Sequence, residues 1–394
     1  MSIRVPGFRF AGVACGIKKG KKKDLALIFS ERPATAAALF TLNRVKGASV
    51  IVGKKRVRRG KLQAVVVNSG NANACTGKRG LRDAERMCLE TARRLEIDPA
   101  LVIPSSTGLV GVSLPTDKVG AGIKEAASQL SPRSLLDAAE AILTTDRFIK
   151  VSVARCSLGG RKVVIAGMAK GAGMVAPNMA TMLAYILTDA AVQLRCLQRL
   201  LSRAAIETFN CITVDGDTST NDTLLFLANG VAGNRAVALG SKEEQVLFKA
   251  AKKVMKDLAL KLVKDGEGAT KLVEIRVEGS RSVAEAKKIA LVVANSQLVK
   301  TAFFGADPNF GRIMVAVGYA GVPIKPEGVD VSFDGVAVVR RGVGINSRER
   351  EAARVLSRPS FKVRIHLHQG RESASVWTSD LTYEYIRINS AYRT

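Results

Sequence analysis

The chain has 394 residues, of which 47% are hydrophobic, and this is enough apolar material for one large core or for two. It contains no run of about 18 uncharged apolar residues and no signal-peptide pattern at its N-terminus, so we expect a cytoplasmic protein with no membrane segment. A net charge of +27 suggests nucleic acid as a partner, but with only 5% aromatic residues to stack bases, a solvated basic surface is the simpler interpretation.

The N-terminal half alternates apolar, strand-like runs with amphipathic, helix-like ones. We expect strands at residues 24–30, 62–68 and 102–104, and helices at 83–95 and 134–143. Two further runs, 151–155 and 162–166, are joined through a glycine pair and predict a hairpin. Alternation of this kind is typical of an α/β fold.

The C-terminal half begins with a buried strand and then changes between helical and strand patterns. The strand is expected at 182–187 and is followed by helices at 193–208 and 242–263 and a strand at 271–278. The last third predicts strands at 329–333, 336–340, 361–368 and 376–377, with a helix at 347–356. Neither a repeat nor a low-complexity linker marks a domain boundary.

Metal-binding and thiol patterns are weak in this sequence. The six cysteines are scattered and form no C-x-x-C pair, so we predict neither a zinc site nor a disulfide framework. The two histidines, His366 and His368, alternate in a strand-like run and thus share a face, which would allow a metal pair. Because their context is ordinary, we interpret them as strand positions and predict no metal. An enzyme with this sequence then needs a catalytic base other than histidine.

Small and polar residues gather in four segments that are candidates for a functional site. The segment 104–111 follows an apolar strand, and in it Thr107 and Gly108 can offer a hydroxyl and a backbone N–H to a developing oxyanion. The other three segments are 68–77, 170–181 and 215–223. The glycines after Lys170 do not form a P-loop, since the lysine precedes them, and an EF-hand starting at Asp215 would have Phe226 in place of its glutamate.

Thr181 is the candidate nucleophile. A threonine hydroxyl needs a base, and without a suitable histidine the known solution is the α-amine of the same threonine, with a pKa near 8. That amine becomes free only if the bond between Ala180 and Thr181 is cut, and the hydroxyl itself can attack the preceding carbonyl. The apolar strand that follows would hold the new N-terminus rigidly.

These segments resemble the ornithine acetyltransferases, also known as bifunctional glutamate N-acetyltransferases. The stretch from Lys170 through Thr181 to Leu183 is similar to the family signature K-G-x-G-M-[IVL]-x-P-x-[ML]-A-T-M-L. The resemblance continues in family order over nearly the whole chain, at residues 6–8, 14–18, 68–77, 144–146, 215–223, 305–312 and 388–394. Two departures are Arg147, where the family usually has threonine, and Phe310, where tryptophan is commoner.

The resemblance implies a reaction in which an acetyl group moves from N-acetylornithine to glutamate through an acetyl ester on Thr181. By position, Thr107 and Gly108 form the oxyanion hole, and the remaining site residues hold substrate: Thr144, Lys170, Thr181, Glu267, Asn389 and Thr394. A lysine can meet the substrate carboxylate and a glutamate its ammonium.

The resemblance also implies the architecture and the assembly. The fold is the α/β one shared with self-processing β-peptidyl aminopeptidases, a sheet sandwich flanked by helices. Cleavage gives an alpha fragment, 1–180, and a beta fragment, 181–394, which together form the enzyme as a heterotetramer of two copies each. No cofactor is implied, and whether acetyl-CoA also serves as an acetyl donor stays open.

Two rival functions remain at this point. A hydrolase of the same fold, an aminopeptidase or amidase, would release the acyl group to water instead of an amine. A basic nucleic-acid-binding protein is the rival of a different class, and it would show a steep loss of affinity with salt and no cleavage.

Overall fold

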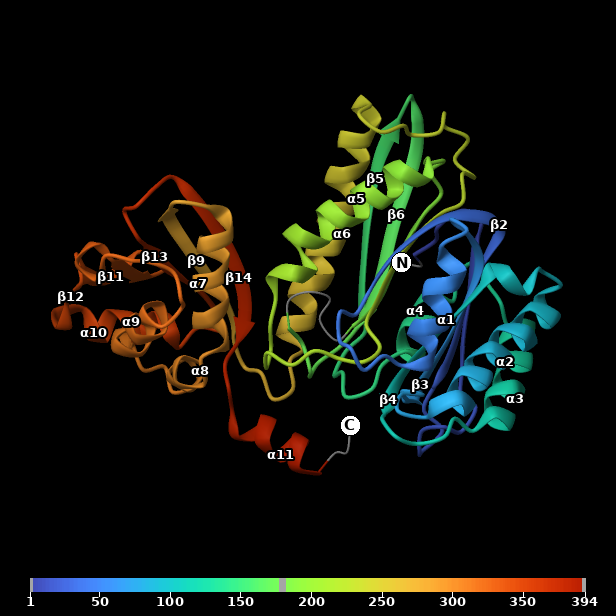
Figure 1. The fold of residues 1–394 in the computed structure, drawn as a ribbon, viewed down its shortest axis with the longest axis horizontal. Coiled ribbons are helices and arrows are strands. Elements are labelled where there is room, and N and C mark those ends of the chain that lie inside the picture. The colour runs from blue at the N-terminus through green and yellow to red at the C-terminus, as the bar shows by residue number, and fades with distance from the viewer. Residues whose placement is uncertain (1–2, 177–181, 392–394) are drawn as a thin grey trace.

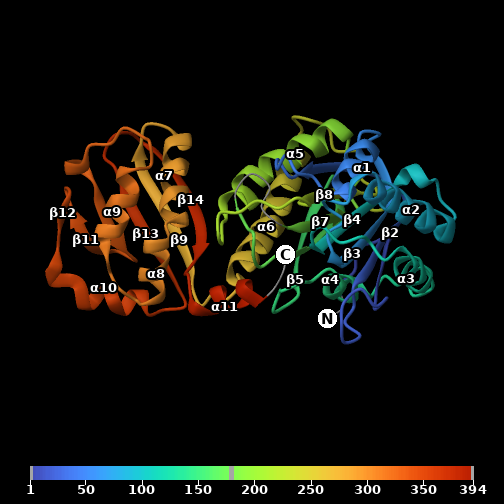
Figure 2. The ribbon, with the colours of Figure 1, turned by 60° about the horizontal axis from the view of Figure 1, so that its bottom comes forward.

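A computed structural model of the chain describes residues 3–176 and 182–391. Two helix-flanked sheets follow one another along the chain and lie side by side (Figure 1). The first body, residues 8–264, contains an eight-stranded sheet, and the second body, residues 272–379, contains a six-stranded one. The last helix, α11 (Tyr383–Ala391), leaves the second body and returns below the first (Figure 2).

The first sheet is folded over along one long strand. In order, its strands are β4 (Val102–Leu109), β3 (Lys61–Asn71), β2 (Leu25–Phe40), β8 (Thr223–Ala228), β7 (Leu183–Thr188), β6 (Arg161–Lys170) and β5 (Lys150–Leu158), and β1 (Phe8–Val13) pairs with β2. The first half of β2 pairs with β1 and β3, and its second half pairs with β8. A register shift between Phe29 and Ala34 separates the two halves, so β2 belongs to both layers of a sandwich.

Side-chain alternation along the strands shows this sandwich directly. Tyr185 of β7 and Val65 of β3 belong to one core between the two halves of the sheet. The next residue of each strand points the opposite way: Ile186 packs with α5 and α6, and Val66 packs with α2 and α3. The layers are therefore helix, sheet, sheet and helix, which confirms the sandwich flanked by helices.

The first body has six helices in its described part. They are α1 (Ala48–Val57), α2 (Gly77–Leu95), α3 (Thr116–Ser128), α4 (Leu135–Ala141), α5 (Leu194–Glu207) and α6 (Lys242–Lys264). Even α6, with 23 residues, carries many lysines, and no helix in the described ranges is long and apolar enough to cross a membrane.

The second body has a core of its own. Its strand order is β12 (Val343–Gly344), β11 (Val336–Arg340), β10 (Asp330–Phe333), β13 (Ser360–His366), β9 (Leu272–Ser280) and β14 (Glu372–Ser379). Its helices are α7 (Val283–Asn295), α8 (Gln297–Phe304), α9 (Phe310–Gly318) and α10 (Glu349–Leu356). Ile275 of β9 and Val293 of α7 lie fully buried in this core. Short 3-10 helices occupy 99–101, 209–211, 326–328 and 346–348.

Several expected elements have different bounds in the structure. The strand expected at 102–104 continues to Leu109, because small, buried Ser105 and Ser106 keep pairing with β3. The strand expected at 361–368 ends at His366, since His368 has a φ of 52° and leaves the extended conformation. By contrast, the helix expected at 242–263 matches α6 to within one residue.

Candidate active site

A cavity of about 310 Å³ lies where β4 and β6 end in the first body. Six of the residues singled out from the sequence line it: Thr107, Gly108, Thr144, Lys170, Glu267 and Asn389. Its other lining residues are Ala72, Val110, Thr145, Gly173, Met174, Asp215, Asp217, Thr218, Ser219, Thr220, Asn221 and Tyr385. Ala180, Thr181 and Thr394 lie outside the described residues.

Thr107 and Gly108 stand on β4 itself, which corrects the prediction that their segment follows a strand ending at residue 104. In the parallel pair β3 and β4, Gly108 lies opposite Gly70. Gly108 has a φ of 129°, and a Cβ atom on it would lie only 2.3 Å from the carbonyl carbon of Gly70. A side chain at this position would clash with the neighbouring backbone, so the close approach of the two strands requires glycine. Thr107 is thus presented to the cavity by a rigid sheet edge.

Lys170, the last residue of β6, is the buried cation of the cavity. Its Nζ lies 3.4 Å from Oγ1 of Thr107 and 4.0 Å from a carboxylate oxygen of Asp146. Burial lowers the pKa of Lys170 below its usual value, although the Asp146 carboxylate acts in the opposite sense. An ammonium with this little solvent around it would interact strongly with the carboxylate of a bound substrate.

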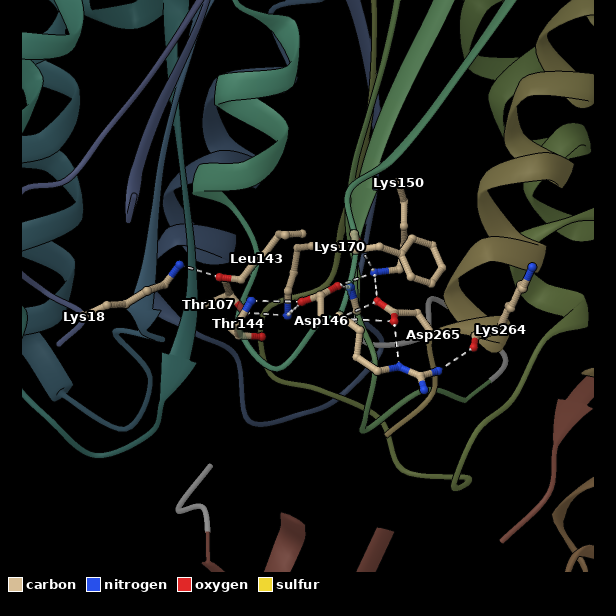
Figure 3. Close-up of polar contacts among 12 residues, drawn as sticks. Lys18, Thr107, Leu143, Thr144, Asp146, Lys150, Lys170, Lys264 and Asp265 are labelled. Atoms are coloured by element: carbon tan, nitrogen blue, oxygen red, sulfur yellow. Dashed lines mark hydrogen bonds and ion pairs between the residues drawn. The ribbon is translucent and has the colours of Figure 1, made fainter. Parts of the chain in front are cut away.

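Asp146 ties the Thr144 loop to the segment that follows Lys170 (Figure 3). Its carboxylate accepts hydrogen bonds from the backbone N–H groups of Thr144 at 2.9 Å and Gly171 at 2.7 Å. It also pairs at 2.6 Å with the buried ammonium of Lys150, which in turn pairs with Asp265. Burial alone would raise the pKa of Asp146, but the Lys170 and Lys150 ammonium groups lower it below its usual range.

Arg147, which stands where the family usually has threonine, does not line the cavity. Its Nε lies 3.2 Å from the buried Asp265 carboxylate, and its side chain is about half exposed. The substitution at this position therefore changes the support of the loop and leaves the lining of the cavity intact.

Glu267 reaches the cavity beside Gly173, and the C-terminal helix supports it. The backbone N–H of Glu267 donates to the carbonyl of Ala172 at 2.8 Å, and Asn389 Nδ2 donates to Glu267 Oε2 at 2.8 Å. A Cβ atom on residue 173 would lie 2.4 Å from Glu267 Oε2, so a larger residue here would force the carboxylate to shift. Asn389 is on α11, and this side of the cavity thus depends on the last helix of the chain.

Asp215 is a cavity residue whose role the sequence did not indicate. Its carboxylate accepts the backbone N–H groups of Met174 at 2.6 Å and Val175 at 2.8 Å, and the hydroxyl of Tyr385 at 3.3 Å. Burial raises the pKa of Asp215 above its usual value. Together, Asp146 and Asp215 hold the segment that leads from Lys170 toward Thr181. Tyr385 carried no sequence signal, because an aromatic residue on an exposed helix is common.

Asp222 holds the residue next to Thr181. Its Oδ1 accepts the backbone N–H of Met182 at 3.2 Å, and the backbone N–H of Thr223 donates to the carbonyl of Met182 at 3.0 Å. Burial raises the pKa of Asp222 well above its usual value, although the hydrogen bond from Met182 acts in the opposite sense. Met182, the residue directly before β7, is therefore held by hydrogen bonds at both its N–H and its carbonyl.

The two histidines lie in the second body, and neither lines the cavity. Their ring centroids are 3.9 Å apart, and His368 Nε2 lies 2.9 Å from Asp330 Oδ2. Across the described ranges, no group of three histidine, cysteine or carboxylate side chains is placed to hold a metal ion. The cavity instead offers the Lys170 ammonium, several carboxylates and the Thr107 hydroxyl, which lies next to the close approach of Gly70 and Gly108. Such a set can bind an amino acid and stabilise an oxyanion.

Sequence comparisons with known proteins match nearly the whole chain. A model described as the ArgJ family matches residues 9–394. The arginine biosynthesis bifunctional protein ArgJ of Geobacter sulfurreducens is 48% identical over 393 residues, which cover 100% of both chains. A crystal structure of the Bacillus halodurans protein of the same description is 39% identical with a TM-score of 0.51, and it covers 53% of this chain and 98% of that chain. An ornithine acetyltransferase complexed with ornithine from Mycobacterium tuberculosis is 38% identical with a TM-score of 0.39, covering 44% of this chain and 92% of that one.

Proposed function

The chain belongs to the ArgJ family, and from this premise we propose that it moves an acetyl group from N-acetylornithine to glutamate through an acetyl ester on Thr181. It is an acyltransferase of arginine biosynthesis. A hydrolase of the same fold is not favoured, because relatives that match from end to end are described as arginine biosynthesis proteins.

The observation that carries this proposal is the convergence of the predicted residues on one cavity. Lys170 ends β6, Leu183 begins β7, and these two residues are register partners in the sheet. The segment containing Ala180 and Thr181 therefore connects two strand ends that meet at the cavity. We infer that a nucleophile in this connection acts at the cavity that Thr107, Lys170 and Glu267 line.

We propose that cleavage between Ala180 and Thr181 produces the fragments 1–180 and 181–394. Both fragments line the cavity, Thr107 and Lys170 from the first and Glu267 and Asn389 from the second. Because β6 and β7 remain hydrogen-bonded neighbours, the cut need not separate the fragments. The solved Bacillus halodurans chain supports this division. The match covers 98% of that chain but only 53% of the chain described here, so the solved chain is about as long as the fragment 181–394.

In the proposed reaction, the Thr181 hydroxyl attacks the acetyl carbonyl of N-acetylornithine while its own α-amine takes the proton. The Thr107 hydroxyl and the Gly108 N–H stabilise the oxyanion, and the proton then passes to the ornithine nitrogen as the C–N bond breaks. The amine of glutamate attacks the acetyl ester in the reverse sequence. Lys170 holds a substrate carboxylate and Glu267 a substrate ammonium, and the other substrate-binding residues are Thr144, Asn389 and Thr394.

The proposal extends to the donor, the assembly and the location. The proposed second donor is acetyl-CoA, and the word bifunctional in the description of the relatives supports a second acetyl donor. No resident cofactor is needed for either half-reaction. We further propose a heterotetramer of two copies of each fragment in the cytoplasm.

The proposal is tested by denaturing intact-mass analysis followed by an assay with N-acetylornithine and glutamate. The expected result is two fragments, together with N-acetylglutamate and ornithine in equal amounts. Acetate release that does not depend on glutamate would indicate a hydrolase instead. An uncleaved chain with salt-sensitive nucleic-acid binding and no transfer would support the non-enzymatic rival.

A further inference from the structure

Asn221 lines the cavity together with Thr107, and its side chain is almost completely buried, with 4% of its surface exposed. It belongs to the polar segment 215–223 and lies directly before Asp222. Neither the proposed reaction nor the family resemblance gives this residue a role. A buried amide at the edge of an active site is held in place by specific partners, and these partners indicate what it does.

The side-chain amide of Asn221 is engaged on both of its ends. Its Nδ2 donates to the carbonyl of Ala72 at 2.6 Å and to the carbonyl of Ser106 at 2.8 Å, and its Oδ1 accepts the hydroxyl of Thr220. An amide nitrogen has two N–H donors, and two backbone carbonyls use them. Such an amide is suited to hold the backbone around it rather than to bind a substrate.

The carbonyl of Ser106 is the important partner, because Ser106 directly precedes Thr107. This carbonyl belongs to the same planar peptide group as the N–H of Thr107, so a hydrogen bond to it fixes the plane from which Thr107 begins. Asn221 precedes β8, which pairs with β7, whereas Ser106 lies on β4, which pairs with β3. The bond therefore joins the two layers of the sandwich at the cavity.

The next residue makes the corresponding contact on the side of the nucleophile. Asp222 accepts the backbone N–H of Met182, the residue that follows Thr181. The Cα atoms of consecutive residues lie only about 3.8 Å apart across a trans peptide bond. Asn221 and Asp222 therefore tie the strand that carries Thr107 to the start of β7 through a single peptide unit.

We propose that Asn221 is a positioning residue that holds the Thr107 hydroxyl where the oxyanion develops. This inference rests on the proposed function, in which Thr107 stabilises that oxyanion. Because the oxyanion exists only after the nucleophile has attacked, a displaced hydroxyl slows the chemical step and leaves the binding of the ground-state substrate almost unchanged.

The experiment is a double-mutant cycle between Asn221→Ser and Thr107→Ala, with kcat and KM measured for each variant. Asn221→Ser alone should lower kcat about tenfold or more and change KM less than about twofold. In the Thr107→Ala background, the same change should lower kcat less than about threefold, because the hydroxyl that Asn221 positions is already absent. A residue that only supports overall stability would give the same factor in both backgrounds.

Gly47→Ala displaces the Asn221 amide without removing it. A Cβ atom on residue 47 would lie 2.4 Å from Asn221 Oδ1, so the amide has to move. The backbone at Gly47 has a φ of −62°, which alanine adopts easily, and Gly47 does not line the cavity. This variant should therefore also lower kcat with little change in KM, and again less so in the Thr107→Ala background.

Asn229→Ser is the matched control. Asn229 is a buried asparagine directly after the other end of β8, its Nδ2 donates to the carbonyl of Pro6 at 3.0 Å, and it does not line the cavity. Its replacement should change kcat less than about twofold, and the melting temperatures of all variants show how much stability each change removes.

Three results would overturn the inference. They are equal factors in the two backgrounds, a rise in KM with unchanged kcat, and a loss of kcat in Asn229→Ser as large as that in Asn221→Ser. The second result would make Asn221 a substrate contact, and the third would make its effect one of general stability. A wild-type enzyme that transfers no acetyl group from N-acetylornithine would instead contradict the proposed function, so the two failures are distinguishable.

Discussion

Asn389 Nδ2 donates a 2.8 Å hydrogen bond to Glu267 Oε2, across 122 positions of the sequence. Asn389 lies on α11, which follows the second body, and Glu267 lies in the connection that leads into that body. The chain thus returns to the cavity after completing a separate core. The second body therefore contributes to the site through the helix that it delivers.

Asn389→Ala should weaken substrate binding and spare the chemical step. The change leaves the Glu267 carboxylate without its amide donor, a loss of about 1 kcal/mol, which corresponds to about a fivefold rise in KM. The turnover number should hold, because the role that we propose for Asn389 lies in substrate binding and not in the chemical step. Steady-state kinetics of this variant and of Ser390→Ala, its neighbour on α11, decide the matter. An equal effect in both would mean that the helix as a whole has moved.

Purified protein should run as two fragments, 1–180 and 181–394, that remain associated. The catalytic base that we propose exists only after the cut, and the pairing of β6 with β7 holds the pieces together. Mass spectra recorded under denaturing and native conditions measure cleavage and association separately. Full transferase activity from an intact chain would contradict the mechanism.

Thr107→Ala should slow turnover about a hundredfold with little change in KM, as expected when one oxyanion donor is lost. The hydroxyl of Thr107 is 3.4 Å from Lys170 Nζ, so the same variant also tests whether Thr107 instead orients that lysine. In the second case KM would rise while kcat held, because a ground-state contact to the substrate carboxylate would be weakened.

Thr181→Ser and Thr181→Ala separate the hydroxyl from the rest of the side chain. Serine keeps the hydroxyl and loses the γ-methyl that restricts χ1, so cleavage and transfer should be slower but measurable. Alanine should fold as one uncleaved chain and form no acetyl-enzyme. Incubation with N-acetylornithine alone should add one acetyl mass to the C-terminal fragment of wild type. An acetylated or cleaved alanine variant would exclude Thr181 as the nucleophile.

Lys18 should make stability depend on pH in the alkaline range. Burial lowers its pKa to about 8, although the Asp24 carboxylate acts in the opposite sense. An unfolded lysine titrates at about pH 10.4, so between these values the unfolded chain binds more protons and stability rises with pH. The Tm of wild type minus the Tm of Lys18→Met should therefore increase between pH 7 and about 9.5. A constant Tm difference would contradict the burial of this charge.

The control for that measurement is Lys19→Met, which removes an exposed charge from the same turn. The Lys18 ammonium also donates to the carbonyl of Leu143 at 2.5 Å, directly before Thr144 (Figure 3). Loss of Lys18 is therefore expected to loosen the Thr144 loop as well, which an increased KM of Lys18→Met at pH 7 would reveal.

Strong local patterns made the predicted elements reliable, and weak ones explain the errors. The apolar face of α6 repeats over 23 residues, so its bounds were predicted to within one residue. The predicted strand ends too early at β4, because Pro104 and Gly108 belong to residue types that are depleted in strands, and pairing with β3 keeps this segment extended. The helices α7, α8 and α9 are absent from the predicted elements, which leave residues 279–328 unassigned. No change in composition marks the start of the second body either.

The sequence by itself determined the candidate residues and the family resemblance, because the chemistry of an acyl transfer restricts the residue types in short motifs. It named Thr107, Lys170 and Glu267 without any information on distance. Only the tertiary structure decided that these residues share one cavity and that Asp215 and Tyr385 support it. The physical reason is that such contacts join positions far apart in the chain, and their geometry arises from the packing of two sheet layers and a returning helix, which no local pattern encodes.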